Sequence, residues 1–147
     1  MNLVGKFFLK QLTVVTVVLG ALGGFESTLN AAGGTLMGMG YSREGQLGGG
    51  TPTAWHNPVP ITTDVQAIAA GSRHSLYLTP DGTLMAMGLN HSGQLGDGTT
   101  VRQLEPVEIA TDVQAIAAGP GHSLYLKTDG TLMGMGSNSG GQLGNHG

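Results

Sequence analysis

Histidine is the first residue type to consider for chemistry, because imidazole binds metals and transfers protons. His74 and His122 occupy equivalent places in two similar segments, so a shared central cavity would let them form a metal site. One histidine per segment without a nearby carboxylate is poor ligand spacing. We therefore expect both to be structural and to satisfy backbone groups. The same argument discounts His56, His91 and His146 as ligands.

Serine, aspartate and glycine suggest three further chemistries, and none is well supported. Ser75 and Ser123 follow the two histidines directly, but adjacent strand residues face opposite ways and cannot form a nucleophile–base pair. The Asp-Gly pairs at 81–82, 97–98 and 129–130 lack the oxygen ligands that calcium gathers within about 12 residues, and predict turns. GQLGDGT has neither a Gly-Lys-Ser or Gly-Lys-Thr sequence nor a following helix to bind phosphate. We expect no catalytic residue, no metal and no cofactor.

The composition indicates that these residues lie on many short strands joined by tight turns. Of 147 residues, 27 are glycine, and only 10% are charged, where about 7% and about 25% are usual. Glycine supplies the positive φ angles and close backbone approaches that such turns require. We therefore predict an all-β protein.

The charges argue against nucleic acid as a partner. Six Lys and Arg against nine Asp and Glu give a net charge of −3, and Lys6 and Lys10 lie at the extreme N-terminus. The few remaining cations are too scattered to neutralise several phosphates. The absence of cysteine excludes disulfides, thiolate catalysis and cysteine-bound zinc.

The sequence contains an internal repeat with a period of 48 residues. GTLMGMG or GTLMAMG starts at residues 34, 82 and 130, GQLG at 45, 93 and 141, and DVQAIAAG at 64 and 112. Regular periods of 20 to 50 residues are typical of repeat architectures. We divide the chain into repeats 34–81 and 82–129 and a partial repeat 130–147.

Each repeat has four segments with strand character, which together predict one four-stranded antiparallel blade. DVQAIAAG is the expected innermost strand, because only small side chains fit where strands converge. HSLYL alternates and is joined to GTLMAMG by Asp-Gly, a strong hairpin signal. The fourth, PVPI or PVEI, starts at Pro58 or Pro106, as expected for the first residue of an outer edge strand.

The first 33 residues precede the repeats. Residues 1–23 join two lysines to a short apolar run that ends in small residues, which is typical of a secretory signal and too short for a membrane span. We expect this apolar leader to direct secretion, with no membrane span in the mature chain. Alternatively, TVVLGALGGFES aligns without a gap on DVQAIAAGSRHS, so residues 24–33 are either a linker or a degenerate strand.

The order AIAAG, HSLYL, DGTLMAMG, GQLGDGT, PVEI across residues 34–147 resembles the regulator of chromosome condensation repeat. That resemblance implies a β-propeller of typically seven blades. Met85 and Met87 stand where the family usually has tryptophans, and we expect them to fill gaps between blades more loosely. With about two and a half copies, this chain forms an open, partial propeller. It is then a fragment of a larger propeller, or a protomer that self-associates to complete one.

The long loop between the third and fourth strands repeats its frame but varies its decoration. Loops carry binding residues, and Trp, Tyr and Arg dominate hot spots, although drift in solvated loops gives the same pattern. The predicted contacts with a protein partner are Tyr41, Arg43, Trp55, His91 and Arg102. We expect a non-catalytic protein-binding module. The alternatives are a nucleotide exchange factor for a small GTPase, as the resemblance implies, and a purely structural or truncated fragment.

Overall fold

The protein is all-β, as the sequence predicts. The computed structural model describes residues 26–28 and 33–144, and this part contains ten strands and no helix, hence none able to span a membrane. The strands are β1 Glu26–Thr28, β2 Gly34–Gly40, β3 Trp55–Val65, β4 Ala67–Ala70, β5 His74–Leu78, β6 Leu84–Gly88, β7 Gln103–Ala110, β8 Val113–Ala118, β9 His122–Lys127 and β10 Leu132–Gly136. The predicted leader, residues 1–23, lies outside the described residues and stays a prediction.

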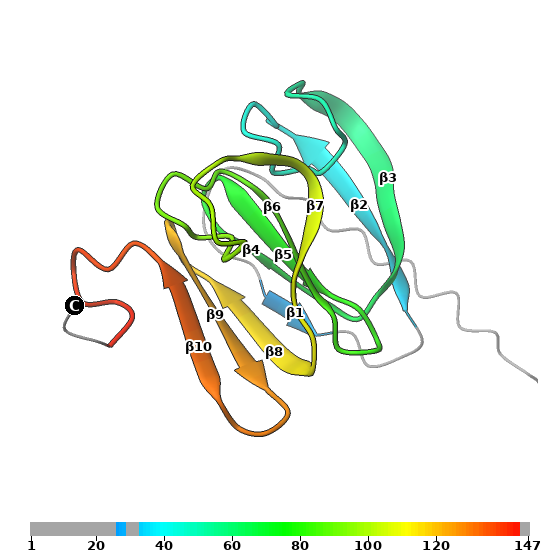
Figure 1. Cartoon of the computed structure of the whole chain (residues 1–147). Helices are drawn as coiled ribbons and strands as arrows, with labels where there is room; N and C mark the ends of the chain where they lie inside the picture. The colour runs from blue at the N-terminus through cyan, green and yellow to red at the C-terminus, as the bar shows by residue number, and fades with distance from the viewer. Residues whose placement is uncertain (1–25, 29–32, 145–147) are drawn as a thin grey trace, which may run out of the picture.

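The strands form three antiparallel sheets that pack face to face as successive blades (Figure 1). The central sheet, β4–β5–β6–β7, is a complete four-stranded blade in chain order, and β1 is added beside β4. One neighbouring sheet is β8–β9–β10, and the other is β2–β3. Together they form the open, partial propeller that the repeats predict.

Strand β1 departs from the alignment of a degenerate repeat. That alignment places Ser27 opposite Ser75 of β5, so β1 should pair with the following strand of its own blade, β2. Instead, Ser27 pairs with Ile68 of β4 in the central sheet. Residues 26–28 are therefore a strand, but one that belongs to the next blade.

The second and third strands of each blade are joined by the hairpins that the Asp-Gly pairs predict. Leu78 pairs with Leu84 across the first hairpin, where Gly82 has a φ of 86°. The Thr79 hydroxyl and Thr83 amide donate to Asp81 and lower the pKa of its carboxyl. The turn-forming role of Asp81 is therefore confirmed.

The fourth strand begins earlier than its proline suggests. β7 starts at Gln103, three residues before Pro106, and β3 starts at Trp55, three residues before Pro58. Both strands lie on an outer edge and pair irregularly with the third strand. An edge strand tolerates proline inside its length because the ring can face away from the ladder.

Alternation along the strands gives the central sheet two faces, and each is buried against a different neighbour. The face toward β2–β3 forms a core with Leu36 and Val65; it consists of Ile68, Tyr77 and Met87, with Met85 partly buried beside them. The face toward β8–β10 forms a core with Val113 and Tyr125; it consists of Ala67, Ala69, Leu76, Leu78, Leu84 and Ala86. The contacts between blades thus supply most of the apolar burial, which is the physical basis of a repeat architecture.

Candidate functional site

The loops that follow β2, β6 and β10 lie along the same edge of the blades, and we call them the loop rim (Figure 1). They comprise residues 41–54, 89–102 and 137–144. Each contains one GQLG turn with the same internal hydrogen bonds. In the central copy, the Leu95 amide donates to Asn90 Oδ1 at 3.0 Å and the Ser92 amide donates to Gln94 Oε1 at 2.9 Å.

The first two GQLG turns are buried because the next blade closes over them. Leu47 and Leu95 are 0% exposed. The Ser75 hydroxyl donates to the Gln46 carbonyl, and the Ser123 hydroxyl to the Gln94 carbonyl, each at 2.8 Å. These repeated residues therefore join blade to blade rather than contact a partner.

Glycine ends each turn where methionine from the next blade needs its space. Gly48 has a φ of 72° and Gly96 a φ of 79°. A Cβ on Gly48 would collide with Met87 Sδ, and a Cβ on Gly96 with Met135 Sδ. Methionine fills the space between blades here, as the sequence predicts.

His74 and Ser123 form a buried pair between blades that the sequence analysis missed. His74 Nε2 lies 2.8 Å from Ser123 Oγ. Since Ser123 donates its proton to the Gln94 carbonyl, its oxygen must accept from His74, which places the imidazole proton on Nε2. Burial, reinforced by the charge of His122 and partly opposed by a His122 backbone group, lowers the pKa of His74 to about 4.

The arrangement of this pair indicates a structural role and not nucleophilic catalysis. His74 is 1% exposed and Ser123 0%, so a substrate has no access, and His74 Nδ1 has no partner among the described residues to orient it. The expectation that His74 bonds to backbone is wrong in detail, because its partner is a side chain. The same residues include no group of three His, Asp or Glu positioned to hold a metal.

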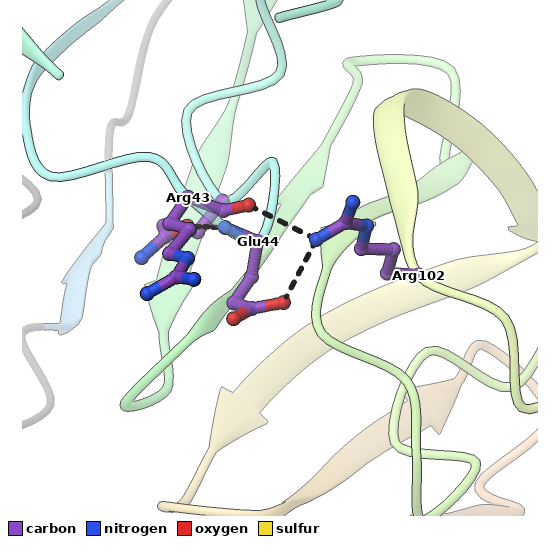
Figure 2. A network of polar contacts seen from close by, with 4 residues as sticks. Arg43, Glu44 and Arg102 are labelled. Atoms are coloured by element: carbon purple, nitrogen blue, oxygen red, sulfur yellow. Dashed lines mark hydrogen bonds and ion pairs between the residues drawn. The ribbon is translucent and has the colours of Figure 1, made fainter. Parts of the chain in front are cut away.

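The non-repeated residues of the loop rim are exposed, in contrast to the GQLG turns. Tyr41 is 49% exposed, and Arg43, His91 and Arg102 are also exposed. Arg102 reaches across from the central blade to the preceding one (Figure 2). Its Nη1 donates to the Arg43 carbonyl at 3.3 Å and to Glu44 Oε2 at 3.4 Å.

The Arg102–Glu44 ion pair leaves most of the guanidinium available to a partner. Its side chains are 48% and 18% exposed, and exposed pairs of this kind stabilise a fold by only about 0 to 1 kcal/mol. The guanidinium of Arg43 lies on the other side of Glu44 (Figure 2). The structure thus brings Arg43 and Arg102 to one place on the rim, although they are 59 residues apart in the chain.

Trp55 is placed differently from the prediction. It begins β3 rather than ending the loop, and its side chain is half-buried. A Cβ on Gly49 would collide with its indole, so the ring lies against the loop of its own blade. His91 lies on the next loop of the rim, where its Nδ1 is 3.4 Å from Ser92 Oγ.

Charge is distributed unevenly between the two ends of the blades. Arg43, Arg73 and Arg102, all three arginines of the chain, lie at the loop-rim end, where the Leu89 amide donates to the Arg73 carbonyl at 2.8 Å. The opposite end carries the hairpin and inter-blade aspartates, namely Asp64, Asp81, Asp112 and Asp129. The rim is therefore the end that favours negatively charged partner groups.

Successive antiparallel blades, joined by a buried repeated turn, define a blade-repeat β-propeller protein. Family comparison identifies the repeat. Two models described as the regulator of chromosome condensation (RCC1) repeat match this chain, one at residues 33–78 and 81–126, the other at 65–94 and 113–142. The chain belongs to this family. A comparison with curated proteins gave no match.

Solved structures of the same fold include two yeast examples. Prp20p from Saccharomyces cerevisiae, described with its binding to Gsp1p and histones, is 32% identical with a TM-score of 0.60, over 72% of this chain and 27% of that one. Yeast RCC1 (Prp20) bound to Kap60 is 30% identical with a TM-score of 0.57, over 69% and 25%. Human WBSCR16 is 22% identical with a TM-score of 0.60, over 73% and 35%. This chain thus spans about a third or less of their lengths.

Proposed function

We propose that this chain is a non-catalytic part of a larger propeller and binds a protein partner through its loop rim. The observation that supports this most is the division within each loop. The repeated residues, such as Leu47 and Leu95, are buried between blades, whereas the non-repeated Tyr41, Arg43 and Arg102 are exposed together. Such a surface can vary without disturbing the core.

The chemistry of the rim suggests the kind of partner. Tyrosine and arginine are enriched among residues that dominate binding energy, and Arg43 and Arg102 offer guanidinium groups that pair well with carboxylates. We therefore propose a protein partner with an acidic segment. The yeast relatives support a protein partner in general, because their structures concern binding to Gsp1p, histones and Kap60.

Site-specific photo-crosslinking tests this surface. A photoreactive phenylalanine analogue in place of Tyr41 should give one discrete adduct with the partner, and the same analogue in place of Lys127, at the opposite end, should give none. Adding Arg102→Ala should reduce the Tyr41 adduct by about tenfold, the equivalent of ~1.4 kcal/mol. Equal adducts from both ends would refute the rim, and stimulated nucleotide release from a small GTPase would favour the alternative function.

We also propose that residues 1–23 direct the chain out of the cytoplasm, on the basis of their two lysines, short apolar run and small residues. Mass spectrometry of the chain recovered from the producing cells measures this directly. Loss of the leader is expected, and an intact Met1 terminus on the exported chain would contradict it.

A further inference from the structure

The last sheet, β8–β10, has an uncovered apolar face, which we call the open face. Its small and apolar side chains are Ala115, Ala117, Leu124, Leu126 and Leu132. They line a shallow groove of about 270 Å³, and Leu132 is 66% exposed. Contiguous apolar surface of this kind marks an interaction site in soluble proteins.

The chain itself shows what chemistry covers such a face. The residues 48 positions earlier are Ala67, Ala69, Leu76, Leu78 and Leu84. Each of them is at most 8% exposed, because β8–β10 packs on them with Val113, Tyr125, Ile116 and Met135. The same face is therefore covered in one blade and uncovered in the next, and its proper cover is the opposite face of another blade.

The third GQLG turn is a second uncovered copy of a covered element. It has the internal hydrogen bonds of the others, with the Leu143 amide donating to Asn138 Oδ1 at 2.9 Å. Its Leu143 is nevertheless half-exposed. Among the described residues, no atom lies within 4 Å of where a Cβ on Gly144 would stand, whereas Met135 fills that place at Gly96. The turn is preformed, and its methionine site is empty.

His122 adds a polar feature to this surface. It repeats His74, and its ring lies over Gly119 as the His74 ring lies over Gly71. His74 is covered and bonds to Ser123 of the next blade, but His122 is half-exposed. The open face thus combines an apolar groove, an empty methionine site and an imidazole.

The other end of the chain carries the matching methionines. Met37 and Met39 of β2 repeat Met85 and Met87, 48 residues later. Leu36 packs toward the central sheet, so alternation places Met37 and Met39 on the face of β2 that points away from it. This is the side from which Met87 and Met135 enter the preceding blade's turn.

We propose that a second copy of this chain binds the open face head to tail. The β2–β3 sheet of one copy covers β8–β10 of the next, and Met39 occupies the site at Gly144. This inference rests on the proposal that the chain is part of a larger propeller, and it does not depend on the partner of the loop rim. A head-to-tail contact is heterologous, so repetition of it closes into a ring if the rotation per chain permits.

Sedimentation velocity of the full chain over a range of concentrations tests the proposal. The chain should associate reversibly, and Leu132→Asp at the tail or Met39→Asp at the head should each weaken association by more than about tenfold. Leu132 is mostly exposed, so Leu132→Asp should fold normally by circular dichroism. Arg102→Ala, on the loop rim, is the matched control and should associate like the original chain.

Mixing the two variants gives the sharpest result. Leu132→Asp retains its head and Met39→Asp retains its tail, so a mixture should form a one-to-one dimer that neither variant forms alone. A monomer at every concentration would refute a second copy as the occupant. Association that survives Leu132→Asp, or a mixture that stays monomeric, would show that the chains meet through another surface.

Discussion

The buried imidazole of His74 should make the stability of this protein sensitive to mild acid. Its folded pKa of about 4 lies below the ordinary value of 6.5, so between these pH values the unfolded chain binds a proton that the folded chain does not. The free energy of unfolding therefore falls as the pH decreases from about 6.5 to about 4, and this contribution stays constant below that window. At ~1.4 kcal/mol per pH unit, the loss amounts to about 3 kcal/mol.

Urea unfolding followed by far-UV circular dichroism, at intervals between about pH 4 and about pH 7, measures this slope. His74→Gln keeps a side-chain amide that can donate to Ser123 but does not titrate, so it should remove most of the slope. His122→Gln is the matched control, because its side chain is half-exposed at the same repeat position. The Asp81 and Asp129 carboxyls, whose pKa values are lowered, act below their ordinary 3.8 and outside the window.

The comparison between the two glutamine variants decides the matter. If His74→Gln retains the slope of the original chain, acid does not act through the buried imidazole and the assignment of its proton to Nε2 loses its consequence. If His122→Gln removes the slope instead, the exposed copy is responsible and the role given to burial is wrong.

Two further substitutions test the contacts between blades. Ser123→Ala leaves both the Gln94 carbonyl and His74 Nε2 without this partner, whereas Ser75→Ala affects one carbonyl; each buried unsatisfied group costs about 1 to 3 kcal/mol, so Ser123→Ala should be the more destabilising by at least ~1 kcal/mol in urea unfolding. Gly96→Ala and Gly98→Ala share a positive φ of about 79°, costing about 1 to 2 kcal/mol. Only Gly96→Ala meets Met135, so its melting temperature should fall further, and equal losses would remove Met135 from the explanation.

The strands and their order were predictable because the repeat compares the sequence with itself. Segments such as HSLYL and GTLMAMG carry period-2 alternation and an Asp-Gly turn, and these are local signals that fix a hairpin. The start of β7 was not predictable from Pro106, because the sequence does not show which backbone groups of an edge strand face a neighbour. The same limitation applies to Trp55, which the structure places in β3 against Gly49.

The site was less predictable, because its contacts join residues of different blades. His74 and Ser123 are 49 residues apart, and their contact follows only when alternation is combined with face-to-face packing. The signal was present: adjacent His and Ser residues in every blade must face opposite neighbours, so the His of one blade meets the Ser of the next. The approach of Arg102 to Arg43 had no such signal, because both residues vary between repeats.

This difference between repeated and non-repeated residues explains how one loop serves two purposes. The GQLG turn must fit the following blade, which constrains Leu95, the Gln94 carbonyl and Gly96 together. The residues on either side, including His91 and Arg102, contact solvent and carry no such constraint. At the third turn the constraint is built in but unused, because the hydrogen bonds inside the turn form whether or not a blade covers it. A chain whose last turn is already shaped for a methionine, and whose first strand presents one, has the requirements for pairing with its own copy.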